Sequence, residues 1–414
     1  MYLSYNEGFF SDSMKQKDSV LGWLAAFLLF AMALPYFLWE YLSYFNLLIK
    51  LPLYIILFTQ IDSKYKDLPF GLFFGFIAIL ADICYQQNLV SMFFDIGLIS
   101  VFVAKKEFLF SVYHKFWTLY VVTLSLSFLC VLLIVIGVSL PSQIIQPLNE
   151  LKNYNYIAYP FLVIPFGEDS IRFNSVFDEP GVVGTFSFLF LVIEQVNLKR
   201  IGNIIILVAG IMSFSLFFYL GLGLYLIFRM ITIKGQIKQK VAIVVLSLLA
   251  FGVVVTNETT QEMIVSRVEW DEDSGSISGD DRAHGDLKEY VAGMRGTDAY
   301  LWGVKNKNLI DSYGGSASIQ NAILKYGFVV VALFFFFYAL YSLKYLKLRL
   351  HWFFFMGVLF ILIYNRPTMF DISRLFLYSM TLFSLFYEGI PFVNKSRKEE
   401  VVKKQYNNHK ITAQ

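Results

Sequence analysis

The sequence predicts an all-α integral membrane protein with about twelve transmembrane helices and two large loops on the outer side of the membrane. Three observations predict this fold class: the composition, the length of the apolar runs and the places where lysine and arginine gather. Of the 414 residues, 57% are hydrophobic, 18% aromatic and 16% charged, whereas a soluble domain carries about 25% charged residues. We therefore expect one polytopic membrane domain over residues 1–414.

Long apolar runs supply the predicted helices. A helix needs roughly 20 apolar residues to cross the hydrocarbon core of a bilayer. The second run carries Lys50 and Pro52, and almost nothing polar separates the seventh from the eighth, so that pair can be divided in more than one way. The runs are 20–38, 43–60, 69–86, 87–104, 116–140, 180–197, 201–217, 218–233, 241–256, 320–343, 352–365 and 374–391.

The basic residues predict the orientation, because Lys and Arg are enriched in cytoplasmic loops. With twelve helices, every basic cluster between the runs falls on the same side of the membrane. Both termini are then cytoplasmic, including a basic tail over residues 392–414. The clusters are Lys15 and Lys17; Lys64 and Lys66; Lys105, Lys106 and Lys115; Lys199 and Arg200; Lys234, Lys238 and Lys240; Lys344, Lys347 and Arg349; and the tail from Lys395 to Lys410.

Two segments are too long to be simple turns, and both are predicted to face outward. Residues 141–179 are rich in aromatic and aliphatic side chains, which predicts a folded cap on the membrane face. Residues 257–319 begin with an acidic, flexible stretch and become helical near "DLKEYVAGM". Loops of this length in a compact fold are usually functional or disordered.

Several classes of protein are disfavoured by simple counts. The two cysteines, Cys84 and Cys130, both lie in apolar runs, which excludes a disulfide framework and a metal-ligand spacing. The net charge of +3 gives no indication of nucleic-acid binding. The N-terminus is too polar for a cleaved signal peptide, so we expect the first apolar run to remain in the mature protein.

The segment "RFNSVFDEPGVVGTFSFLFLV" brings charge to the edge of an apolar run. In one reading it only starts a helix: Asp178 is the N-cap, Pro180 occupies the first turn, and Glu179 is stabilised by the helix dipole. In the other reading, Glu179 and Arg172 meet a lipid-linked polar substrate at the outer face. The helix N-terminus would make Glu179 a weaker base, although it could still orient a hydroxyl.

This segment, placed after the first large outward loop, resembles the start of a helix in the oligosaccharide repeat-unit polymerases, also called O-antigen polymerases. The likeness extends to about a dozen helices and two large outward loops. Some members carry an Arg-x10-Gly pattern in each loop; Arg282 to Gly293 matches it, and Arg172 to Gly184 is one residue longer.

The resemblance implies a GT-C-like membrane glycosyltransferase in the bacterial inner membrane. Its reaction would move a glycan from undecaprenyl pyrophosphate onto the sugar end of another lipid-linked repeat unit, at the outer face. The implied partners are undecaprenyl-pyrophosphate-linked oligosaccharides, membrane lipids, a chain-length regulator and a flippase.

The reaction itself predicts which residue types matter. Pyrophosphate leaves as a stable anion, so the site needs cations to hold it and a positioned hydroxyl nucleophile. Arginine binds phosphate oxygens bidentately and stays charged. The candidates for catalysis are Glu179, Arg172, Arg282 and His284, and those for substrate binding are Asp178, Arg295, Arg366 and Arg374.

Each candidate also has an ordinary interpretation. The arginines could be surface or interface residues, although Arg374 sits at the edge of a run, where an unpaired charge is costly. His284, the only outward histidine, is either a general base or an exposed loop residue. Asp280 and Asp281 could hold a divalent metal, but adjacent acids in a Ser/Gly-rich loop are more often solvated, and we expect no metal or cofactor.

Four further charges lie inside apolar runs. We expect Asp82 and Asp95 to line a cavity, and Glu194 and Arg229 to snorkel or cap near the cytoplasmic ends.

Two alternatives to the polymerase remain open. A ligase that transfers finished glycan to a lipid A core would use a similar loop arrangement. A transporter or flippase should show repeats and helices broken at the midplane, with charges there. The sequence shows no repeat and concentrates its charges in the outward loops, which favours chemistry at the outer face.

Overall fold

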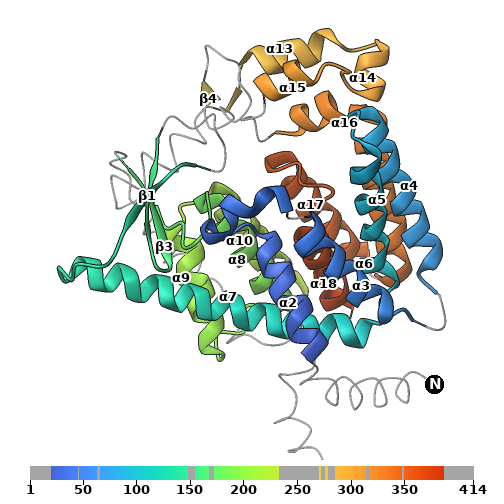
Figure 1. The fold of residues 1–414 in the computed structure, drawn as a ribbon. Coiled ribbons are helices and arrows are strands. Elements are labelled where there is room, and N and C mark those ends of the chain that lie inside the picture. Colours follow the sequence, from blue (N-terminus) through green and yellow to red (C-terminus); the bar gives the residue numbers. More distant parts are fainter. Residues whose placement is uncertain are drawn as a thin grey trace, which may run out of the picture.

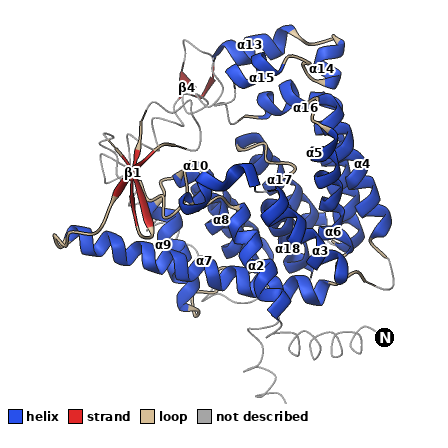
Figure 2. Ribbon diagram, viewed as in Figure 1, coloured by secondary structure: helices blue, strands red, loops and turns tan. Residues whose placement is uncertain are grey.

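The computed structural model describes residues 20–44, 46–62, 66–147, 154–166, 172–232, 270–271, 276–277, 285–313, 318–346 and 349–386. Most of these residues are helical, as expected (Figures 1 and 2). The α-helices are α2 (Val20–Met32), α3 (Leu51–Thr59), α4 (Leu68–Cys84), α5 (Leu89–Ile96), α6 (Ser100–Val103), α7 (Lys106–Val135), α8 (Pro180–Ile193), α9 (Ile201–Met212), α10 (Leu216–Thr232), α13 (Gly285–Gly293), α14 (Asp298–Trp302), α15 (Lys307–Ser312), α16 (Ile319–Tyr345), α17 (Arg349–Asn365) and α18 (Ile372–Phe386).

The shorter elements include strands, so the all-α expectation is too simple. They are the 3-10 helices η1 (Tyr36–Tyr44) and η3 (Gly97–Ile99), the π-helix η2 (Asn46–Lys50), and the strands β1 (Gln143–Ile145), β2 (Tyr156–Tyr159), β3 (Leu162–Pro165), β4 (Trp270–Asp271) and β5 (Ser276–Ile277).

Among the described residues, two helices, α7 and α16, are long and apolar enough to cross a membrane. Only 22% of the most apolar part of α7 and 39% of that of α16 is buried inside the protein. Large apolar side chains are exposed on other helices too, for example Phe76 at 56% on α4. Such faces would be unfavourable in water, so these helices match a lipid surrounding better than the core of a soluble protein. The other apolar helices have 10–17 residues.

The predicted runs and the helices differ where the chain bends. The run 20–38 ends as an α-helix at Met32 because Pro35 follows, and the run 87–104 is divided into α5, η3 and α6. The run 43–60 becomes η2 and α3, with the division next to Pro52. The run 241–256 lies outside the described residues.

Two other helix boundaries differ from the predicted runs. The run 116–140 begins ten residues earlier than predicted, at Lys106, and forms the 30-residue α7. This helix is roughly 45 Å long, so it must tilt to fit a bilayer; Figure 1 shows it crossing beneath α2, which it contacts. The ambiguous pair of runs divides at Phe214, whose φ of 46° ends α9.

The run 320–343 is not one continuous helix. Gly327 breaks α16 with a φ of 83° and a ψ of 158°. Gly303, at a φ of 82°, packs against the same place, and the Val304 N–H donates to the Leu324 carbonyl over 2.8 Å. A Cβ on either glycine would overlap backbone atoms of the other segment. The break thus attaches α14 to the end of the bundle.

The described part of the first large loop contains a small sheet. Strands β1, β2 and β3 form an antiparallel sheet in that order, with Ile157 opposite Ile144 and Ile164. The sheet lies at the end of α7, where the Ser127 hydroxyl donates to the Phe161 carbonyl over 2.6 Å. In the second loop, α13 covers the stretch that was predicted to be helical.

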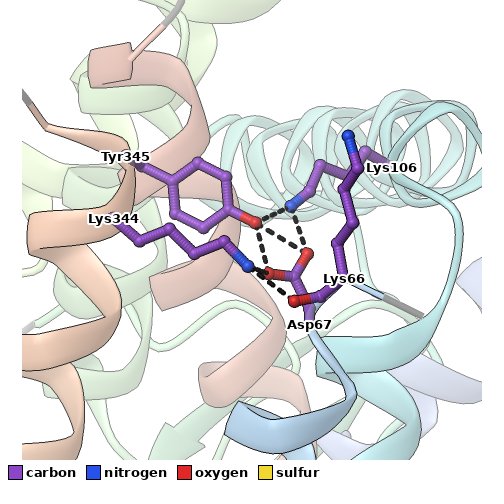
Figure 3. Close-up of polar contacts among 5 residues, drawn as sticks. All are labelled: Lys66, Asp67, Lys106, Lys344 and Tyr345. Atoms are coloured by element: carbon purple, nitrogen blue, oxygen red, sulfur yellow. Dashed lines mark hydrogen bonds and ion pairs between the residues drawn. The ribbon is translucent and has the colours of Figure 1, made fainter. Parts of the chain in front are cut away.

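Three of the predicted cytoplasmic basic clusters meet around Asp67 (Figure 3). Lys106, at the start of α7, lies 2.7 Å from Asp67 Oδ2, and Lys344, at the end of α16, lies 2.6 Å from Oδ1. The Tyr345 hydroxyl donates to the same carboxylate at 2.6 Å. Burial raises the pKa of Asp67, but Lys106 and Lys344 outweigh it and hold the pKa below its usual value. We call this the inner end, and the end where α8 and α18 begin the outer end.

Candidate functional site at the outer end

The start of α8 presents a carboxylate to a distant arginine. Pro180 is the first helical residue, and Glu179 before it is extended, with φ −140° and ψ 140°, as a residue preceding proline prefers. The N-cap is therefore Glu179, and the expectation that Asp178 fills this place is wrong. Within the described part of the chain, the Glu179 side chain does not cap the helix; its carboxylate accepts a hydrogen bond from Arg366 Nη2.

Arg366 reaches Glu179 from the connection between α17 and α18. Its N–H donates to the Leu362 carbonyl over 2.8 Å, which ends α17 just before Pro367. The guanidinium lies against the first turn of α8, where a Cβ on Gly181 would overlap Nη2. Gly181 therefore provides the space in which the ion pair forms. The side chains are 14% exposed for Arg366 and 35% for Glu179.

A second arginine lies at the start of the neighbouring helix α18. Asp371 caps that helix: its Oδ1 accepts from the Arg374 N–H at 2.9 Å and from the Ser373 hydroxyl at 2.5 Å. Its Oδ2 pairs with Arg374 Nη1 at 3.2 Å. The Arg374 side chain is 12% exposed, so the start of α18 holds a cation that is mostly removed from water.

Both arginines have an unused donor. The Nε atoms of Arg366 and Arg374 are buried and have no hydrogen-bond partner among the described residues. A buried donor without an acceptor costs about 1–3 kcal/mol, so such groups call for an explanation. Helices α8 and α18 pack against each other, and helix N-termini favour anions. Guanidinium donors of this kind bind the oxygens of carboxylates and phosphates.

Arg172, the second residue predicted for this site, lies at the turn between α9 and α10. Its Nε donates to the Ser213 carbonyl at 3.3 Å and its Nη2 to the Phe214 carbonyl at 3.1 Å. Ser213 is the C-cap of α9, and a cation there satisfies exposed carbonyl groups. The geometry gives Arg172 a structural role, and direct participation in catalysis stays a prediction.

Asp178 and Arg295 are the remaining predicted site residues that the structure describes. The backbone carbonyl of Asp178 accepts from the Tyr156 hydroxyl at 2.5 Å, which ties the first outer loop to the start of α8. Burial, with Asp178 nearby, raises the pKa of Tyr156, so it remains a donor at neutral pH. Arg295 is exposed on the turn after α13. Arg282 and His284 lie outside the described residues, as do Asp280 and Asp281.

Two of the four charges predicted inside apolar runs, Asp95 and Glu194, form ion pairs. Lys50 Nζ lies 3.6 Å from Asp95 Oδ1, and Asp82, which interacts with Asp95, is 4% exposed. Glu194 accepts from Arg200 and from the Tyr113 hydroxyl. Asp82 and Asp95 were expected to line a cavity; Lys50, treated in the sequence only as a weakness of its run, is their partner.

Sequence reasoning missed Gly181 and Asp371. The glycine directly after Pro180 was the available signal, because glycine weakens a helix and so suggests that another group approaches closely. Asp371, three residues before Arg374, has the spacing of a cap. Among the residues that the structure places, three or more His, Cys, Asp or Glu side chains do not gather as a metal site would require. Comparisons with protein-family models, curated proteins and solved structures find no match to this chain.

Proposed function

We propose that this protein is a membrane glycosyltransferase that polymerises undecaprenyl-pyrophosphate-linked repeat units into a surface polysaccharide. It works at the outer face of the bacterial inner membrane, with about twelve membrane-spanning helices in a GT-C-like arrangement and both termini in the cytoplasm. The exposed apolar surfaces of α7 and α16 support a membrane location. The gathering of basic clusters at Asp67 supports the orientation.

The observation that carries the proposal is the pair of arginines at the starts of α8 and α18. Each guanidinium has one nitrogen bound to a carboxylate and a buried Nε–H with no acceptor in the described part of the chain. A diphosphate offers several oxygens for guanidinium donors of this kind, and it is the leaving group of this reaction. Binding it as it departs stabilises the charge that develops in the transition state.

The chemistry then needs few groups. The bond between the anomeric carbon of the donor sugar and the pyrophosphate oxygen breaks, and its electron pair leaves with undecaprenyl pyrophosphate. An acceptor sugar hydroxyl forms the new bond to that carbon and gives its proton to a carboxylate. We assign this role to Glu179, whose side chain is 35% exposed beside Arg366.

A gel of surface glycan tests this function in a deletion strain. Loss of a polymerase leaves a core that carries a single repeat unit, whereas loss of a ligase or a flippase leaves the core alone. Core alone in the deletion strain would contradict the proposal and indicate one of the alternatives.

Point variants test the site. Arg366→Ala, at normal protein level, should abolish long chains, and Arg366→Lys should restore them only in part because lysine cannot bind two oxygens in a fork. Arg349→Ala is the matched control, since Arg349 is exposed at the other end of α17. Wild-type chain lengths in both Arg366→Ala and Arg374→Ala would rule out the arginine pair as the diphosphate site.

A further inference from the structure

We propose that Glu179 occupies the place of the substrate phosphate on Arg366 and is displaced by it, so that binding of the donor releases the proton acceptor. This inference rests on the proposed function and adds an order of events to it. From the sequence, Glu179 is either stabilised by the helix dipole or a weak base that orients a hydroxyl; in the structure its carboxylate is bound to Arg366, the cation that we propose holds the diphosphate.

Arg366 has little room to serve two anions separately. Its guanidinium lies against the first turn of α8 at Gly181. Any other residue there would carry a Cβ that overlaps Nη2. The side chain is 14% exposed, so it has few directions in which to turn toward solvent. A phosphate that fills the buried Nε–H would also take the adjacent Nη2, because these two nitrogens form one fork. Nη2 is the atom that Glu179 holds.

Glu179 is the mobile member of the pair. It is 35% exposed, more than twice as exposed as Arg366. It also precedes Pro180 at the N-cap, outside the regular helix, and its side chain makes no capping hydrogen bond to α8. The carboxylate is therefore the partner that moves when an oxyanion arrives.

Displacement changes what Glu179 can do. While it is bound to Arg366, its oxygen is engaged by the guanidinium and cannot accept from a sugar hydroxyl. Once the diphosphate holds Arg366, that oxygen is released next to the anomeric carbon, where it can take the proton of the acceptor hydroxyl. The donor must therefore bind before the acceptor is activated, which prevents deprotonation in the absence of a leaving group.

Binding of inorganic pyrophosphate to the full-length protein in detergent tests the competition. Glu179→Gln keeps the shape but removes the competing charge, so it should bind pyrophosphate about fivefold more tightly than the wild type, the scale of a partly exposed ion pair. Arg366→Ala should lose the binding. Glu40→Gln, which removes an exposed carboxylate on η1, is the matched control and should bind as the wild type does.

The direction in which Glu179→Gln changes the affinity for pyrophosphate decides whether Glu179 competes for Arg366. Weaker or unchanged binding by Glu179→Gln would overturn the inference, since Glu179 would then position Arg366 rather than compete for it. That result leaves the proposed function standing as long as Arg366→Ala still loses binding. Binding that none of the variants changes would also remove the arginine site on which the function rests.

Turnover gives a readout that a merely structural role would not produce. Glu179→Gln should lower the KM for the lipid-linked donor while greatly reducing kcat, because binding improves and the proton acceptor is lost. A variant that only loosened the site would raise KM instead.

Discussion

Replacing Gly181 by alanine tests whether the close contact between α8 and Arg366 matters for function. The new Cβ would overlap Arg366 Nη2, so the guanidinium must move away from the helix. Because the overlapping atom is the end of a flexible side chain, a shift of about 1 Å removes the clash. A misplacement of that size at a reacting group costs on the order of 100-fold in rate.

The effect on stability should be small, because two contributions oppose each other. Alanine in place of glycine within a helix stabilises by about 0.5–1 kcal/mol. Weakening the partly exposed pair of Arg366 with Glu179 costs up to about 1 kcal/mol. The free energy of unfolding should therefore change by less than about 1 kcal/mol, while polymer synthesis is nearly lost.

Thermal unfolding of the purified protein and a gel of surface glycan measure the two quantities. Gly223→Ala on α10 is the matched control, since a Cβ there meets no atom within 4 Å in the described structure, and it should leave chain length normal. Long chains of wild-type length made by Gly181→Ala would refute the reasoning, because they would show that Arg366 need not lie where the structure has it.

Three further predictions concern the break in α16, the inner end and metals. Gly327→Ala should fold poorly, because φ is 83° and a Cβ would overlap the backbone at Leu301. Gly296→Ala is the control: φ is also 83° but the space around it is open, so its free energy of unfolding should fall by only about 1 kcal/mol, measured by thermal unfolding. The pKa of Asp67 is lower in the folded protein than the unfolded value of about 3.9. The ionised carboxylate therefore stabilises the fold fully near neutral pH, and this stabilisation is lost as the pH falls through the folded pKa. Unfolding scans should show Asp67→Asn to be less stable than the wild type at pH 7, and the gap should close on acidification below about pH 4; a gap that stays constant would contradict the assignment. Polymer synthesis by purified protein should survive saturating chelator, and loss of activity restored by a divalent ion would overturn the expectation that no metal is needed.

Local chemistry made the start of α8 predictable. Pro180 and the apolar run after it are enough to place the helix, which begins at Pro180 as expected. The N-cap was misassigned because aspartate is a favoured cap residue and glutamate is not, whereas Glu179 stands at that place with its carboxylate held by Arg366. Its partner lies 187 residues away, a contact that no sequence spacing reveals.

The apolar runs predicted where helices lie but not where they break. Hydropathy cannot detect the break at Gly327, because it depends on backbone contact with α14. The strands of the first outer loop were hidden for a similar reason: β2 and β3 have short apolar sequences that fit either a helix or a strand. The basic clusters were a better guide to which segments lie at the same end of the bundle. Three of the clusters lie together around Asp67.

The most direct measurement of the central claim uses purified protein and an undecaprenyl-pyrophosphate-linked repeat unit. Wild-type protein and Gly223→Ala should convert it to a ladder of longer chains, and Arg366→Ala should leave it unchanged. A full ladder from Arg366→Ala would contradict the account. So would a wild-type protein that leaves its native lipid-linked repeat unit unreacted.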